Sequence, residues 1–216
     1  MSDRFNKQKV DKSMRIGVFG GSFDPIHQGH LILAEQCREQ AGLDAVWFVP
    51  CALSPDKERG AQGTDRQRIE MIELAIAGHP AFQLARIEID RGGVSYTVDT
   101  LKAIRELHAD DELFLLLGAD SLDKFDTWRE PSEICQLATP LVVSRPGAKE
   151  VDLSVLEKYV DSQRYESFCR HSIVSPLIDI QSRQIRKKIE KQQSIRYLTP
   201  RAVEKYIETQ KLYCQK

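Results

Sequence analysis

Residues 15–30 read RIGVFGGSFDPIHQGH, and the character of the chain changes within this stretch. The first five residues are mostly apolar, which predicts a buried β-strand over residues 15–19. Two glycines follow, and they let the backbone turn sharply and bring its amide groups against a ligand. A helix is expected from Gly29 onward. A strand, a glycine turn and a helix in this order predict the first βαβ unit of a parallel sheet.

The same alternation of short apolar runs and longer amphipathic ones continues along the chain. Further strands are predicted over residues 45–49, 82–85, 113–117 and 141–143. Helices are predicted over residues 29–40, 65–77 and 97–107, where apolar residues recur at three- and four-residue spacing. After Gly147 the pattern loosens, and it recovers over residues 172–180.

Two final helices are predicted over residues 183–191 and 200–211, the last with Thr199 as its cap and Pro200 in its first position. The fold class is therefore α/β: a doubly wound, mainly parallel, Rossmann-like sheet with a small helical part over about residues 181–216. In such a sheet, ligands bind at the carboxyl ends of the strands, near the switch point of the strand order.

The composition suits one domain with a full core, because 41% of the 216 residues are hydrophobic. The polar residues 1–13 are predicted to form a flexible extension, and residues 14–216 a single domain. With 31 basic and 32 acidic side chains, the formal net charge is −1, which disfavours a general nucleic-acid or membrane binder. Five cysteines without a Cys-x-x-Cys spacing fit a reducing compartment. No apolar run predicts a signal peptide or a bilayer span, so we expect a cytoplasmic protein.

His27 and His30 stand three residues apart where the first helix begins, so their rings can lie side by side near the positive end of the helix dipole. A lone histidine there would more often be a core residue or a helix cap. The pair behind a Gly-Gly-Ser loop favours a functional role. Two histidines without a nearby third ligand are a weak case for zinc. Neither the dinucleotide fingerprint nor a Walker loop is present.

These residues suit the transfer of a nucleotidyl group to a phosphate. A phosphate monoester is largely a dianion at neutral pH, since its second pKa is about 6, and it needs no general base. The reaction needs donors that hold both reactants in line and stabilise the charge that builds on the phosphorus and on the leaving pyrophosphate. Imidazole N–H groups supply such donors. The expected chemistry is in-line transfer without a covalent intermediate.

The segment from Gly20 to His30 resembles the His-x-Gly-His nucleotidyltransferase superfamily, in particular the bacterial nicotinate-nucleotide adenylyltransferases. The resemblance runs through nearly the whole chain from Met14. Residues 95–101 resemble the segment that borders the nicotinate mononucleotide pocket, and residues 118–122 with Trp128 resemble a ribose-binding and ring-stacking segment. Residues 180–186 resemble the Ile-Ser-Ser-Thr-x-Ile-Arg signature that holds ATP phosphates. The resemblance implies AMP transfer from ATP to nicotinate mononucleotide, giving deamido-NAD and pyrophosphate in NAD biosynthesis.

The resemblance also implies roles for individual residues. The catalytic residues would be His27, His30 and Arg186. The residues that contact ATP would be Gly20, Gly21, Ser22, Phe23, His27, His30, Gly118, Asp120, Ser182 and Arg186. The residues that contact nicotinate mononucleotide would be Lys57, Tyr96, Thr97 and Trp128. The implied cofactor is Mg2+, bound with ATP through the triphosphate rather than by a protein metal site.

Several of these residues have a second interpretation. Asp120 either accepts hydrogen bonds from ribose hydroxyls or caps a helix. Trp128 either stacks on an aromatic ring or packs in a small core beneath its polar loop. Ser182 and Arg186 are four apart at a helix start and would converge on a phosphate, whereas the lysines that follow are interpreted as a solvated helix face.

Residues 50–57 depart from the family pattern, because Asp56 stands where the family usually has a histidine. We expect Lys57 to contact a substrate phosphate and Lys57 or Arg59 to hold Asp56, the alternative being a solvated loop without a role. Three other functions stay open: pantetheine-phosphate adenylyl transfer, cytidylyl transfer, and a regulatory module that binds adenine nucleotides without turnover. The expected partners are ATP and nicotinate mononucleotide, neither nucleic acid nor membrane, with a homo-oligomer possible.

Overall fold

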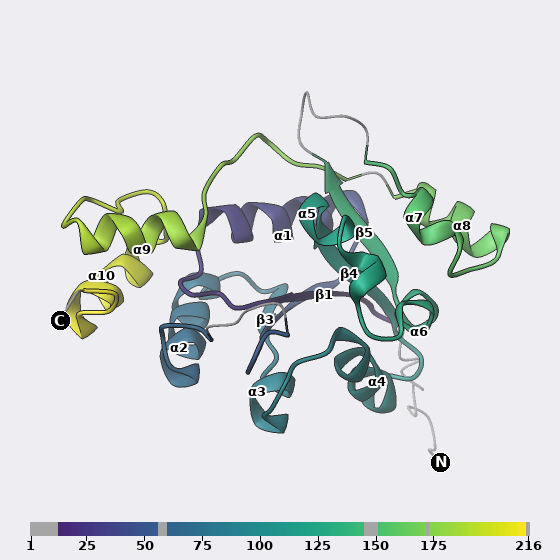
Figure 1. The fold of residues 1–216 in the computed structure, drawn as a ribbon, viewed down its shortest axis with the longest axis horizontal. Coiled ribbons are helices and arrows are strands. Elements are labelled where there is room, and N and C mark those ends of the chain that lie inside the picture. Colours follow the sequence, from purple (N-terminus) through teal and green to yellow (C-terminus); the bar gives the residue numbers. More distant parts are fainter. Residues whose placement is uncertain (1–12, 56–59, 145–150, 172, 215–216) are drawn as a thin grey trace, which may run out of the picture.

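The computed structural model describes residues 13–214 apart from residues 56–59, 145–150 and 172 (Figure 1). Most of the predicted N-terminal extension therefore lies outside the described residues. The described strands form a six-stranded sheet in the order β3-β2-β1-β4-β5-β6, and all neighbours pair in parallel. The strands are β1 Arg15–Gly21, β2 Ala45–Pro50, β3 Phe82–Leu84, β4 Glu112–Gly118, β5 Thr139–Ser144 and β6 Ile173–Val174.

The strand order reverses between β1 and β4, so the switch point of the sheet lies between these two strands. Ile16 pairs with Leu113 and Val18 with Leu115. This register brings the glycines at the end of β1 beside Gly118 at the end of β4. The ligand-binding position that a doubly wound sheet offers is thus framed by glycines on both sides.

The helices cover both faces of the sheet (Figure 1). Their bounds are α1 Gln28–Gln40, α2 Asp65–Ile76, α3 Ile87–Arg91, α4 Thr97–Leu107, α5 Ala119–Leu122, α6 Pro131–Leu137, α7 Ser154–Glu157, α8 Ser162–Cys169, α9 Ser182–Glu190 and α10 Arg201–Gln210, with a 3-10 turn η1 at Phe125–Thr127.

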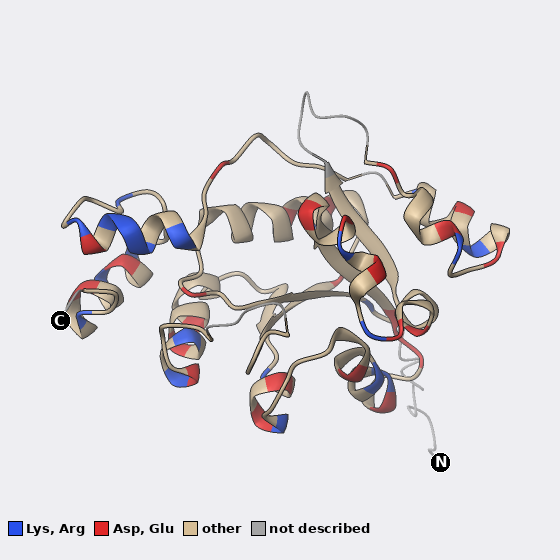
Figure 2. Ribbon diagram, viewed as in Figure 1, with Lys and Arg blue, Asp and Glu red and all other residues tan. Residues whose placement is uncertain are grey.

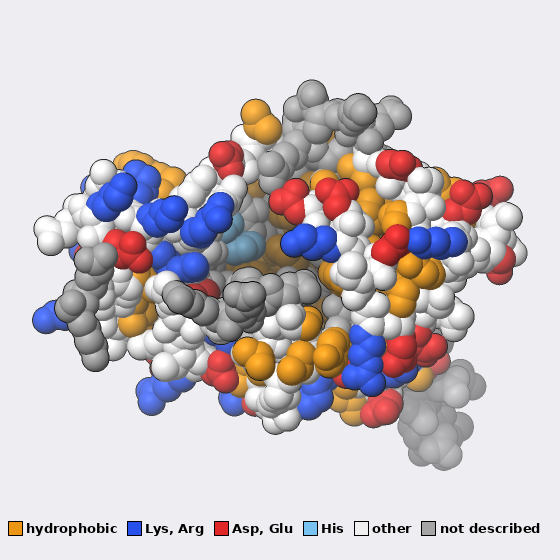
Figure 3. All heavy atoms as spheres, viewed as in Figure 1, with side chains coloured by type: hydrophobic (Ala, Val, Ile, Leu, Met, Phe, Trp, Pro, Cys, Tyr) orange, Lys and Arg blue, Asp and Glu red, His pale blue; other side chains and the backbone are white. Residues whose placement is uncertain are grey.

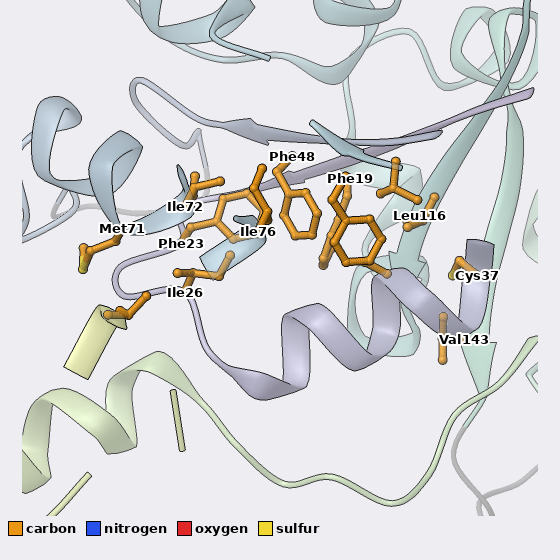
Figure 4. Packing of buried hydrophobic residues seen from close by; sticks show 14 of the residues in the cluster. Phe19, Phe23, Ile26, Cys37, Phe48, Met71, Ile72, Ile76, Leu116 and Val143 are labelled. Carbon is orange, nitrogen blue, oxygen red and sulfur yellow. The ribbon is translucent and has the colours of Figure 1, made fainter. Parts of the chain in front are cut away.

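Alternate residues of the four inner strands, β1, β2, β4 and β5, enter two separate cores, as the two-residue period of a strand requires. Phe19 and Leu116 point into a core shared with α1, α2 and α10, which Figure 4 shows around Phe48 and Ile72. Val18 points to the opposite face of the sheet, into the second core, where it and the other buried strand residues of that face pack against α4 and α6. Burial on both faces explains why the strands read as nearly continuous apolar runs.

The structure confirms the doubly wound parallel fold and every predicted strand, with ends shifted by up to two residues. The prediction for the start of the last helix was wrong. Pro200 is the flanking residue and α10 begins at Arg201, while the buried Thr199 hydroxyl donates to the Ile26 carbonyl at 2.9 Å. That carbonyl belongs to the loop after β1, so Thr199 satisfies a distant acceptor rather than its own helix.

The short helices α3 and α5 to α8 were not predicted, because each is too short to show a helical period. In the described parts of the chain, none of the helices combines the length and the apolar character that crossing a membrane requires.

Candidate active site

The loop after β1 is shaped by its two glycines and Phe23. A Cβ at Gly20 would meet nothing within 4 Å, which leaves this side of the backbone open, whereas a Cβ at Gly21 would lie 3.1 Å from the Phe23 ring. Phe23 adopts a left-handed φ of 46° and is buried against Phe19, with the two ring centres 5.4 Å apart. Phe23 therefore anchors the loop in the core through its ring, and its contact with ATP stays a prediction.

The two histidines lie as their spacing predicts. His27 is the N-cap of α1, and its ring stacks on that of His30 with centres 3.6 Å apart and planes tilted by 20°. The His27 backbone N–H donates to His30 Nδ1 at 3.2 Å. Because Nδ1 accepts this bond, neutral His30 carries its proton on Nε2. The fold thus selects the tautomer that presents His30 Nε2–H as a donor.

His27 is held in its neutral form. Its side chain is 5% exposed, and burial lowers its pKa from 6.5 to about 4. Among the described residues, its Nδ1 has no hydrogen-bond partner, and a Cβ at Gly29 would stand 3.1 Å from that atom. A side chain at position 29 would therefore crowd the His27 ring. At neutral pH this ring acts as a hydrogen-bonding group and not as a cation.

Helix α9 docks on the same loop. The Ser182 hydroxyl donates to the Pro25 carbonyl at 2.9 Å, and Arg186 Nη1 donates to the Asp24 carbonyl at 2.6 Å. The structure thus joins the predicted C-terminal residues to the histidine loop. Lys and Arg residues follow along α9 (Figure 2), and cationic side chains gather beside the hollow in which a histidine is visible (Figure 3).

A cavity of about 280 Å³ opens at the switch point. Its walls contain seven of the predicted site residues: Gly20, Gly21, Ser22, Tyr96, Thr97, Gly118 and Trp128. Among the described residues, six others are not part of this lining: Phe23, His27, His30, Asp120, Ser182 and Arg186. Lys57 and Asp56 lie outside the described residues. The cavity therefore has a glycine-lined end at β1 and β4 and an aromatic end at Tyr96 and Trp128.

The structure decides differently on the alternative interpretations of Asp120 and Trp128. Helix α5 is capped by Gly118, so the helix-cap interpretation of Asp120 is wrong, and its side chain is exposed in the first turn. Trp128 is half-buried, lies 5.4 Å from the Phe125 ring and packs against the second core while it also lines the cavity. The packing interpretation of Trp128 is therefore confirmed, and its stacking on a substrate ring stays a prediction.

Arg68 of α2, which the sequence analysis missed, is fully buried beneath the site. Its guanidinium donates to the Ser22 carbonyl at 2.9 Å and to the Cys51 carbonyl at 2.6 Å, and it pairs with Asp65 at 2.6 Å. Arg68 therefore ties the loop after β1 to the loop after β2. The sequence signal that could have found Arg68 is its position within the predicted amphipathic helix, because it falls on the face that also carries the buried apolar residues.

A second buried group, Glu88, lines the cavity and was also missed. It accepts a hydrogen bond from the Thr100 hydroxyl at 2.6 Å, and burial raises its pKa. Ser95 also bonds to Glu88 and receives the Ala52 N–H at 3.0 Å. This chain of hydrogen bonds holds the start of α4 and the loop after β2 in fixed positions along the cavity wall.

The described residues contain no group of three or more His, Cys, Asp or Glu side chains that could form a metal site. A divalent ion that enters with ATP would take most of its ligands from the phosphates and from water, as Mg2+ commonly does. The donors in this site are N–H groups, which suit phosphate oxygens rather than a cation.

The family model described as Cytidylyltransferase-like matches residues 18–199. This confirms the class that the parallel sheet and its glycine loop indicate, the nucleotidyltransferases. A protein of Salinibacter ruber named "Probable nicotinate-nucleotide adenylyltransferase" is 41% identical over 201 residues, which cover 93% of this chain and 98% of its own. A protein of the same name from Thermus thermophilus is 44% identical over 202 residues, covering 93% and 100%. The chain therefore belongs to the cytidylyltransferase-like family and, within it, to the nicotinate-nucleotide adenylyltransferases.

A solved structure from Plasmodium falciparum, described as nicotinic acid mononucleotide adenylyltransferase complexed with NaAD, has the same fold. Its TM-score to this chain is 0.72, at 22% identity and with 93% of this chain and 97% of that chain covered. This similarity confirms the Rossmann-like architecture.

Proposed function

We propose that this protein transfers AMP from ATP to nicotinate mononucleotide, giving deamido-NAD and pyrophosphate. The observation that carries the proposal is the cavity at the switch point, which joins the glycine loop of β1 to an aromatic end at Tyr96 and Trp128. Backbone amides at one end suit phosphates, and aromatic side chains at the other suit a pyridine ring. The names of the relatives support this pair of substrates.

In the proposed reaction a phosphate oxygen of nicotinate mononucleotide attacks the α-phosphorus of ATP. The new P–O bond forms in line as the bond from the α-phosphorus to the bridging oxygen breaks, and pyrophosphate leaves with that electron pair. His30 donates its Nε2–H to a phosphate oxygen as charge builds there. His27, whose ring is also neutral, is the second hydrogen-bonding imidazole. Arg186 binds a phosphate of ATP at the start of α9. A preorganised donor of this kind lowers the barrier because it needs no reorganisation during the reaction.

The acceptor is proposed to bind at the aromatic end. Trp128 would stack on the pyridine ring, with Tyr96 beside it. Thr97 is the first residue of α4, and the free N–H groups of that helical turn favour an anion. Lys57 would contact the acceptor phosphate, a role that stays a prediction from the sequence. Mg2+ would enter with ATP and screen its phosphates.

The test is to incubate the protein with ATP, Mg2+ and one phosphorylated acceptor at a time: nicotinate mononucleotide, nicotinamide mononucleotide, phosphopantetheine or glycerol 3-phosphate. Pyrophosphate release and the mass of the dinucleotide are measured together. We expect deamido-NAD from nicotinate mononucleotide at the highest kcat/KM. A faster reaction with phosphopantetheine would contradict the assignment, and ATP binding without pyrophosphate release from any acceptor would identify a regulatory module.

A further inference from the structure

The residues that follow α10 turn back to the loop after β1. Helix α10 ends at Gln210 and is followed by Lys211 in a left-handed conformation, and Leu212 donates its N–H to the Ile207 carbonyl at 3.0 Å. This is the bonding pattern of a glycine-type helix stop, and it aims the next residues across the helix end. Leu212 is buried in the first core, and Tyr213 follows with a φ of 63°. Its hydroxyl donates to Asp24 Oδ1 at 2.7 Å, across 189 positions of sequence.

Asp24 lies in the loop that carries the histidines and is 3% exposed. Besides the Tyr213 hydroxyl, it accepts the Gln62 N–H on Oδ2 at 2.8 Å and the Gly63 N–H on Oδ1 at 3.0 Å. A Cβ at Gly63 would stand 2.9 Å from Asp24 Oδ1 and 3.3 Å from the Tyr213 hydroxyl. The three groups are thus packed so closely that glycine is required where they meet.

Arg186 is only loosely paired with this carboxylate. Its Nη1 lies 3.7 Å from Asp24 Oδ2 but 2.6 Å from the Asp24 carbonyl oxygen. A buried carboxylate needs donors or a cation to offset the cost of burial. Here neutral donors supply much of that compensation. The Arg186 guanidinium therefore does not have to close onto the carboxylate.

We propose that Tyr213 is a positioning residue for nucleotidyl transfer: by donating to Asp24 it keeps Arg186 from closing onto that carboxylate and leaves its guanidinium for a phosphate of ATP. The inference rests on the proposed function, in which Arg186 binds ATP. Without the hydroxyl, Asp24 Oδ1 keeps only the Gly63 N–H among the described donors, and the uncompensated charge draws Arg186 in. Burial first, and then the Asp24 charge, raise the pKa of Tyr213, so its hydroxyl stays protonated and remains a donor.

The test compares Tyr213→Phe with Tyr206→Phe. Tyr206 lies on α10 and its hydroxyl also donates to a carboxylate, that of Glu70 on α2, which pairs with the exposed Arg66 rather than with Arg186. Both variants delete one oxygen and keep the ring. We expect Tyr213→Phe to lower kcat/KM for ATP about tenfold, the size expected for one hydrogen bond to a charged group. The KM for nicotinate mononucleotide should stay unchanged, and Tyr206→Phe should match the wild type.

Equal kinetics of the two phenylalanine variants would overturn the inference. ATP affinity measured by calorimetry without acceptor tests the same contact in the absence of turnover, so the outcome does not depend on which acceptor the enzyme uses. A Tyr213→Phe protein that binds ATP as tightly as the wild type would refute the role even if the proposed reaction is confirmed.

A double-mutant cycle locates the effect. If Tyr213 acts through Arg186, then Tyr213→Phe should not weaken ATP binding further in an Arg186→Gln background. Additive losses in the cycle would assign Tyr213 to another route and would reject the positioning of Arg186.

Discussion

The His27 ring stacks on the His30 ring with centres 3.6 Å apart, and the His27 backbone N–H donates to His30 Nδ1. Both histidines therefore lie on the first turn of α1, where the N-cap residue His27 orients the ring of His30 three positions later. Two protonated rings at this distance would repel each other, and the positive end of the α1 dipole would add to that repulsion. The arrangement favours two neutral imidazoles, the form in which we expect them to donate hydrogen bonds.

Replacing His30 with alanine should lower kcat at least 100-fold while the protein stays folded, because one preorganised donor typically contributes about 10²–10³ in rate. Steady-state kinetics and a thermal unfolding curve measure the two effects. His108→Ala is the matched control, since His108 follows the end of α4, pairs with Asp111 and has no part in the loop after β1. A folded His30→Ala protein with near wild-type turnover would contradict the assigned role.

The burial of neutral His27 should make the protein less stable as the pH falls. Its folded pKa of about 4 lies below the ordinary 6.5, so the unfolded chain takes up the proton first. The stabilising contribution is complete above pH 6.5 and is lost progressively down to pH 4, by at most about 3 kcal/mol.

Urea unfolding at pH 7 and pH 4.5 measures this loss. His27→Asn should show a smaller difference between the two pH values. His171, whose pKa burial also lowers, contributes with the same sign in both proteins. An identical pH dependence of the wild type and His27→Asn would exclude His27 as the source.

Trp128→Ala should weaken binding of nicotinate mononucleotide by about 1–3 kcal/mol, the range for a base stacked on an aromatic side chain. ATP binding should hardly change. A modest fall in melting temperature is expected as well, because Trp128 packs against the second core. Calorimetry with each substrate separates the two effects: equal losses for both, with a large fall in melting temperature, would leave Trp128 with a packing role alone.

Arg68→Met should destabilise the protein by about 1–3 kcal/mol for each of the two carbonyls, Ser22 and Cys51, that lose their donor. It should also raise the KM for both substrates, since both loops line the cavity. Arg68→Lys should have a stability and KM values between those of the wild type and Arg68→Met, because an ammonium cannot reproduce the two-pronged hydrogen bonding of the guanidinium. Arg66→Met on the exposed side of α2 is the control and should leave stability and kinetics unchanged. Wild-type kinetics in Arg68→Met would show that the link between the loops has no part in the site.

The local features of this protein were determined by its sequence alone. Strands buried on both faces show as apolar runs, and the two glycines after β1 mark the turn into α1. The spacing of His27 and His30 places both rings on one helical turn, since three residues nearly complete a turn. Tyr96, Thr97, Gly118 and Trp128 come from segments that resemble the family, and the fold brings these four to one cavity. Each of these signals lies within a few neighbouring residues.

The tertiary structure alone decided which distant groups complete the site. Asp24 accepts hydrogen bonds from Gly63 and Tyr213, and Arg68 joins two loops. Glu88 accepts a hydrogen bond from Thr100. The partners in these contacts are separated by 12 to 189 positions of sequence. The wrong prediction of Thr199 as a helix cap has the same origin, because its hydroxyl donates to the carbonyl of Ile26 and does not cap the helix that follows. A buried polar group binds whichever partner the packed chain brings within about 3 Å, and that choice leaves no periodic trace in the sequence.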